Sequence, residues 1–168
     1  MRYLLREKLL AIGDDFTIKD ETGREVFFVD GKVFTLRDEL EIKDMQGQQV
    51  AVVKRKMVSL RPSYEIWQGG QRIAVVSRSL IRIFRDKFQV DVPGPDDLEV
   101  QGDFFSREYT FRRDGQVVAQ VSRRWFSITD SYGIDIREGE NDVLILASAI
   151  VIDRISFEEN EHDVGPHR

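Results

Sequence analysis

The chain contains no cysteine and only two histidines, and each shortage narrows the chemistry available to it. Without cysteine there are no disulfides and no thiolate metal ligands. His162 and His167 both lie in a polar C-terminal stretch, so the rest of the chain cannot supply a Ser-His-Asp set or a histidine metal site. Glycine-rich phosphate-binding motifs are also missing. The sequence therefore predicts no cofactor, no metal and no catalytic residue, and favours a binding domain over an enzyme.

An excess of basic charge and a long apolar segment are absent too. The net charge of −5 gives no support to a nucleic-acid partner. The first eight residues contain three charges after Tyr3, unlike the apolar middle of a signal peptide. The longest apolar run, Val143–Ile152, would reach as a helix across about half of the ~30 Å hydrocarbon layer. We expect a cytoplasmic protein without a transmembrane span, and peripheral attachment to a membrane stays open.

What is present is a hairpin pattern that repeats. The pattern Ile-Lys-Asp-x-x-Gly at 18–23 returns 24 residues later at 42–47. A longer one, Gly-Gln-x-x-Ala-x-Val-Ser-Arg at 70–78, returns at 115–123, an offset of 45 residues. A unit of this length cannot bury its apolar face alone, so several copies must close on one another.

Turn signals separate short apolar or alternating runs along most of the chain. Asp30-Gly31 predicts a tight hairpin between Val26–Val29 and Lys32–Phe34, because Asp-Gly accommodates positive φ angles. Longer turns are predicted at 20–23, 44–47, 68–70 and 113–115, and a central loop at 93–97. Strands are predicted around 40–42, 50–53, 64–67, 73–76, 81–84, 98–100, 109–111, 117–119 and 126–128. Short strands at this spacing indicate an all-β barrel or sandwich.

The run Val143–Ile152 breaks the strand pattern. Its β-branched residues suit a strand, but ten apolar residues without a turn signal favour a helix, with Asn141-Asp142 as its N-cap. A helix that is apolar on every side must be buried. We therefore predict one domain over residues 1–157, and a disordered polar tail over 158–168.

Four segments in order along the chain carry a family resemblance: Ile12–Ile18, Ser59–Ile66, Glu99–Phe104 and Trp125–Ile136. Through them the chain resembles the tubby C-terminal-like superfamily, in particular its LURP-one-related branch. The resemblance implies a roughly twelve-stranded antiparallel barrel around a hydrophobic helix, Asp142–Arg154. Tubby-type domains bind phosphoinositide head groups and scramblase-type members act on phospholipids, whereas most LURP-one-related members have no assigned activity.

Carboxylates offer the remaining catalytic alternative. Asp103, Glu108, Asp130 and Asp135 fall in or near the family-like segments and could form an acid/base pair. The simpler interpretation is that Asp103 and Asp130 stabilise turns by bonding to their own backbone. An enzyme that uses carboxylates alone is therefore the least favoured hypothesis.

Basic residues supply the candidate ligand-binding positions. Lys54 and Lys56 lie on one face of an extended chain and Arg55 on the other, and two neighbouring cations could bind a phosphate. Arg78 and Arg123 occupy equivalent positions in the longer repeat. A solvated strand face is the competing explanation. From these residues we predict a binding domain for anionic phospholipid head groups or another small anion, with a protein-interaction or structural module as the alternative.

Overall fold

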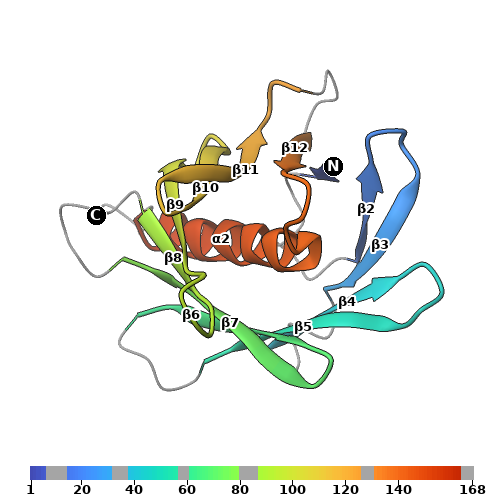
Figure 1. The fold of residues 1–168 in the computed structure, drawn as a ribbon, viewed down its shortest axis with the longest axis horizontal. Coiled ribbons are helices and arrows are strands. Elements are labelled where there is room, and N and C mark those ends of the chain that lie inside the picture. The colour runs from blue at the N-terminus through green and yellow to red at the C-terminus, as the bar shows by residue number, and fades with distance from the viewer. Residues whose placement is uncertain (7–14, 32–37, 57–60, 80–86, 126–130, 164–168) are drawn as a thin grey trace, which may run out of the picture.

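The protein is a closed antiparallel barrel in which each strand pairs with its neighbours in sequence, and β1 closes on β12 (Figure 1). The structure is a computed structural model, and it describes residues 1–6, 15–31, 38–56, 61–79, 87–125 and 131–163. The strands are β1 Arg2–Arg6, β2 Phe16–Asp20, β3 Glu25–Asp30, β4 Glu39–Asp44, β5 Gln49–Arg55, β6 Ser63–Gln68, β7 Gln71–Arg78, β8 Lys87–Asp91, β9 Leu98–Asp103, β10 Glu108–Arg113, β11 Gln116–Ser122 and β12 Ser131–Ile136. These twelve strands confirm the predicted all-β barrel.

The interior of the barrel is filled by the helix α2, Asp142–Asp163, which runs through the ring of strands (Figure 1). Strand residues alternate between core and surface, as in β2, where every second side chain is buried. On α2 every residue from Leu144 to Ile152 is buried, including Ser148, whose hydroxyl donates to the carbonyl of Leu144. The helix is therefore the core of the barrel, as its lack of a polar face predicts.

The sequence repeats correspond to equivalent hairpins. In β2–β3 and β4–β5 the ladder shifts register at the same place, after Ile18 and after Ile42. Asp20 and Asp44 then accept backbone N–H groups from the residues two and four positions later, at 2.9–3.1 Å. The β6–β7 and β10–β11 hairpins likewise shift register 45 residues apart, after Ile66 and after Phe111.

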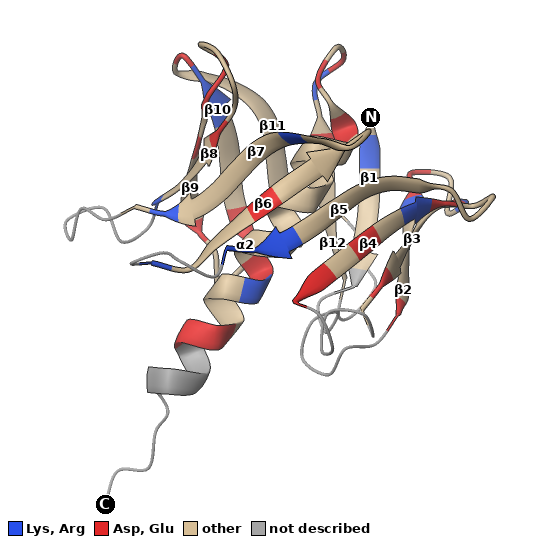
Figure 2. Ribbon diagram, turned by 90° about the horizontal axis from the view of Figure 1, so that it is seen from below, with Lys and Arg blue, Asp and Glu red and all other residues tan. Residues whose placement is uncertain are grey.

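The two ends of the barrel differ. At one end the hairpins turn tightly, with only two residues between β6 and β7 and between β10 and β11. At the other end, which we call the helix-exit end, β5, β7, β9 and β11 finish and the C-terminal part of α2 leaves the barrel (Figure 2). The predicted loop at 93–97 joins β8 to β9 at the tight end, where Asp97 accepts the N–H of Val92.

The predicted N-terminal end of α2 is confirmed. Asn141 is the N-cap, since its side-chain oxygen accepts the N–H of Leu144 at 3.1 Å. The hydroxyl of Tyr3 donates to Asp142 in the first turn. The predicted C-terminal end at Arg154 is wrong, because α2 continues to Asp163. In the described part of the chain, no helix is both long and apolar enough to cross a membrane.

The predicted hairpin at Asp30-Gly31 is also wrong. A strand has two edges, and both edges of β3 are occupied, because Val29 pairs with Phe16 of β2 and with Ile42 of β4. Asp30 continues the pairing with β4, opposite Glu41. Residues 32–34, and the strands predicted at 81–84 and 126–128, lie outside the described residues.

Candidate functional site

The four predicted cations lie at or next to the helix-exit end, because β5, β7 and β11 all finish there. Lys54 is the penultimate residue of β5, Lys56 follows that strand, Arg78 ends β7 and Arg123 follows β11. One end of the barrel therefore carries all four candidates, although they sit on different strands.

Lys54 and Arg55 point to opposite faces of β5, as the strand period requires. The ammonium of Lys54 lies 4.9 Å from the centroid of the Trp67 ring and 3.9 Å from a carboxylate oxygen of Glu39. Arg55 instead approaches the helix, with a guanidinium nitrogen 4.0 Å from Glu158. Lys56 is exposed, and within the described residues its ammonium has no ion pair. Lys56 is thus the more available cation of the predicted pair.

Arg78 is the most enclosed of the four. Its guanidinium carbon lies 4.9 Å from the ring centroid of Phe88 and 5.9 Å from that of Phe104. Its Nη2 is 3.3 Å from Glu159 on α2, while its Nη1 is buried and, as far as the structure is described, makes no hydrogen bond. The two aromatic rings therefore hold a cation in a fixed position, and a single helix carboxylate neutralises it.

Arg123 lies in a different environment from Arg78, despite the equivalent repeat position. It is exposed, and its backbone N–H donates to Glu108 at 3.1 Å. The next residue, Arg124, is exposed too, and its Nε lies 3.9 Å from the same carboxylate. At the helix-exit end, the segment after β11 therefore has two exposed arginines.

The barrel order keeps the four cations apart. One strand separates β5 from β7, and three strands separate β7 from β11. At about 4.8 Å per strand, these gaps correspond to roughly 10 Å and 19 Å along the wall. The structure does not gather Lys54, Lys56, Arg78 and Arg123 into one pocket, and distributes them around the helix-exit end instead.

A feature that sequence reasoning missed lies between these cations. Phe105, in the short turn between β9 and β10, leaves 72% of its surface exposed. On α2, Phe157 is also exposed, at 38%, and it lies one helical turn beyond Asp153. Arg107 of the same β9–β10 turn reaches to 3.6 Å from Asp153, so the turn and this face of the helix are neighbours.

The predicted acid/base carboxylates have structural partners. Asp103 accepts the N–H of Ser106 at 3.0 Å, and hydrogen bonding from Ser106 lowers the pKa of the Asp103 carboxyl. Glu108 accepts from the hydroxyl of Ser122 at 3.0 Å, and Asp135 pairs with Arg2 at 3.3 Å. Asp130 lies outside the described residues. Among those described, no three acidic or histidine side chains are placed to hold a metal ion.

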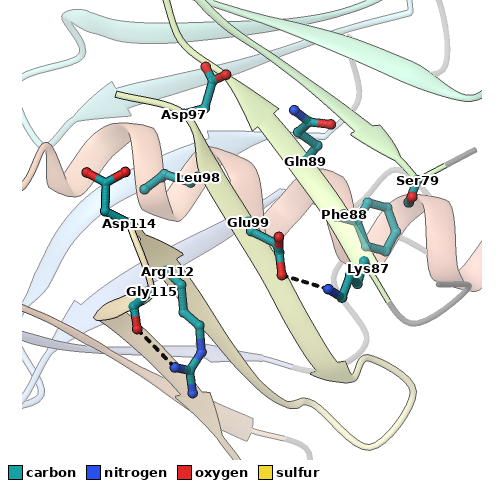
Figure 3. A pocket seen from close by; sticks show the side chains of 10 residues that line it. All are labelled: Ser79, Lys87, Phe88, Gln89, Asp97, Leu98, Glu99, Arg112, Asp114 and Gly115. Carbon is teal, nitrogen blue, oxygen red and sulfur yellow. Dashed lines mark hydrogen bonds and ion pairs between the residues drawn. The ribbon is translucent and has the colours of Figure 1, made fainter. Parts of the chain in front are cut away.

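A groove of about 380 Å³ lies on the outer wall of the barrel, across β8, β9 and β10 (Figure 3). Its lining carries both signs of charge. Lys87 and Glu99 form an ion pair of 2.9 Å across it, and Arg112 donates to the carbonyl of Gly115 at 3.2 Å. The groove therefore has a polar lining with both signs of charge, unlike the mostly apolar lining of a typical small-molecule pocket.

Comparison with known proteins assigns the family. The LURP-one-related family model matches residues 1–153, which span all twelve strands and most of the buried part of α2. The chain belongs to the LURP-one-related family. The tubby-like superfamily recognised from the sequence is thereby confirmed.

Two further similarities extend across almost the whole LURP-one-related domain. The chain is 29% identical over 160 residues to the uncharacterized protein YxjI of Bacillus subtilis, covering 95% of this chain and 96% of that protein. A crystallographic structure of an Arabidopsis thaliana protein superposes with a TM-score of 0.65 at 19% identity, covering 95% of this chain and 91% of that one. At that identity the second similarity establishes the fold alone.

Proposed function

We propose that this LURP-one-related chain is a non-catalytic domain that attaches to anionic phospholipid surfaces through its helix-exit end. The observation that carries the proposal is Phe105, a large apolar side chain 72% exposed at a turn on the end that bears the four candidate cations. An exposed phenylalanine is unfavourable in water, and it becomes favourable when the ring enters the interfacial region of a bilayer.

Charge and aromatic surface act together in this proposal. Lys56, Arg123 and Arg124 are exposed and would face the lipid head groups while Phe105 and Phe157 enter the interface. Each cation near an anionic surface contributes roughly 1 kcal/mol, and the attraction falls off within a Debye length. Because the whole chain carries −5, the attraction depends on how the cations are placed and not on net charge. The anionic cytoplasmic leaflet is the membrane surface that fits such a domain.

Vesicle co-sedimentation tests the proposal with matched variants. The unmodified protein should sediment with vesicles of phosphatidylserine and phosphatidylcholine at low salt, and much less with phosphatidylcholine alone. Phe105→Ala should weaken this binding about tenfold, whereas Met45→Ala should leave it unchanged, because Met45 is 45% exposed at the tight end. Replacing Lys54 and Lys56 by glutamate should abolish binding. Equal binding by the Phe105 and Met45 variants would contradict the proposal.

A protein-interaction module is the second candidate, and the outer groove is the observation that favours it. Its positive and negative side chains would suit a polar polypeptide segment better than a lipid. Failure of the unmodified protein to bind any anionic vesicle at low salt would favour this candidate over the first.

A further inference from the structure

The guanidinium of Arg78 forms an ion pair with a carboxylate of the same chain. Nη2 of Arg78 lies 3.3 Å from Glu159, near the C-terminal end of α2. The two side chains are 23% and 38% exposed, so the pair lies at the surface of the barrel mouth. The guanidinium itself is held by Phe88 and Phe104, and its Nη1 makes no hydrogen bond among the described residues. The site is therefore a preformed cation with unused hydrogen-bonding capacity.

Glu158, the residue before Glu159 on α2, also pairs with arginine side chains. Glu158 accepts from Arg154 at 2.8 Å and lies 4.0 Å from Arg55 of β5. The last turns of α2 thus direct two adjacent carboxylates at guanidinium groups on two different strands. In Figure 2 this acidic turn follows the part of the helix that emerges next to the basic end of β5.

Core packing does not hold these two glutamates. Among the residues whose burial is described, Ile155 is the last core residue of α2, and Phe157 beyond it is exposed. Beyond it, Glu158 and Glu159 form ion pairs with Arg55 and Arg78, and partly exposed pairs of this kind contribute little each and weaken with salt. The contacts of Glu158 and Glu159 with the barrel are therefore electrostatic and lie outside the apolar core.

We propose that Arg78 is the centre of a phosphate-binding subsite, and that Glu159 is an internal competitor that occupies it until an anionic ligand displaces it. This inference rests on the proposed function, because it assigns the regulation of the same barrel end. A phosphate group offers several oxygens to a guanidinium and forms paired hydrogen bonds that one carboxylate oxygen at 3.3 Å does not. The ligand chemistry is a phosphate monoester or diester, supplied by a lipid head group or by a soluble phosphate.

The test compares the unmodified chain of 168 residues with two variants that each lose one negative charge. Glu159→Gln removes the competitor. Glu138→Gln makes the same charge change at an exposed position next to the tight end. The Nε resonance of Arg78 is followed by NMR while inorganic phosphate is added, with sodium chloride adjusted to hold ionic strength constant. The same variants are then compared for binding to phosphatidylserine vesicles.

Glu159→Gln should lower the phosphate concentration at half-response by about two- to fivefold, as expected for loss of one partly exposed competing ion pair. Glu138→Gln should behave like the unmodified chain, and Arg78→Gln should remove the enhanced phosphate affinity of the Glu159 variant when binding is followed by calorimetry. Equal midpoints for the two glutamate variants, or no phosphate response in either, would overturn the inference. A phosphate response without vesicle binding by any variant would overturn the membrane proposal while retaining the subsite for soluble phosphates.

Discussion

The hydroxyl of Tyr132 on β12 donates a hydrogen bond of 2.5 Å to the carboxylate of Asp153 on α2, inside the barrel. Both residues are buried, and Arg107 approaches the same carboxylate oxygen at 3.6 Å. A buried carboxylate is stable only when it is paired and hydrogen-bonded. This contact therefore joins the buried part of α2 to the wall of the barrel.

Tyr132→Phe should lower the free energy of unfolding by about 1–3 kcal/mol, because it removes a donor from a buried acceptor. Tyr109 provides the matched control. It is equally buried, but its hydroxyl has no hydrogen-bond partner within the described residues, so Tyr109→Phe should be neutral or slightly stabilising. Urea denaturation of both variants measures the difference. Equal losses would show that the Tyr132–Asp153 bond does not stabilise the fold.

Burial raises the pKa of every one of the four tyrosines, Tyr3, Tyr64, Tyr109 and Tyr132. In the unfolded chain tyrosine titrates near pH ~10, so the folded state retains protons that the unfolded state loses above this pH. The stability associated with these groups is complete below pH ~10 and falls as the pH rises beyond it. Tyrosinate absorbance should therefore increase at higher pH in the folded protein than in the urea-unfolded chain. Independent ionisation of any tyrosine near pH ~10 in the folded protein would contradict the burial described.

Ile150 tests the helix as the core of the barrel, since only 3% of its surface is exposed. Ile150→Ala should lower the free energy of unfolding by about 2–5 kcal/mol, and Ile150→Asp should prevent folding by burying an unpaired carboxylate. Val117 is 41% exposed on its strand, so Val117→Ala should change the free energy of unfolding by less than about 0.5 kcal/mol. Chemical denaturation ranks the three. A stable, soluble Ile150→Asp protein would mean that α2 does not occupy the interior.

Gly102 on β9 lies directly opposite Tyr109, where a side chain would not fit. It has a φ of +145°, and a Cβ there would lie 2.5 Å from the carbonyl oxygen of Glu108 and 2.6 Å from Cα of Tyr109. Gly47 also has a positive φ, +85°, but open space around it. Gly47→Ala should therefore cost about 1–2 kcal/mol from the dihedral alone, and Gly102→Ala on the order of 3 kcal/mol or more. Thermal and urea unfolding of the two variants separate backbone strain from steric overlap. Equal losses of unfolding free energy would exclude steric overlap at Gly102.

Local chemistry made the hairpins predictable. An aspartate followed three residues later by glycine, as in Asp20 to Gly23, closes its turn through its own carboxylate and a positive φ, and neither depends on distant parts of the chain. Asp30-Gly31 carried an equally clear local signal and was still interpreted wrongly. Which strand occupies the second edge of β3 is decided by the pairing of the whole barrel.

The candidate site was less predictable, because exposure is a property of the assembled fold. Phe105 reads in the sequence as one more apolar residue, and only the position of its turn leaves it exposed. The predicted end of α2 at Arg154 is too early because the apolar run stops at Ile152, whereas the helix continues through charged residues that pair with Arg55 and Arg78. Those partners lie about 80 to 100 residues away in the chain, and no local pattern connects them.

The most direct test of the membrane-facing barrel end uses the absence of cysteine, which allows one environment-sensitive fluorophore to be attached at a single chosen site. Phe105→Cys and Met45→Cys place the label at opposite ends of the barrel, both at exposed side chains. On addition of phosphatidylserine vesicles at low salt, the label at 105 should shift to shorter wavelength, and the label at 45 should keep its aqueous emission. An emission shift of the label at position 45, or no shift of the label at position 105, would contradict membrane attachment through the helix-exit end.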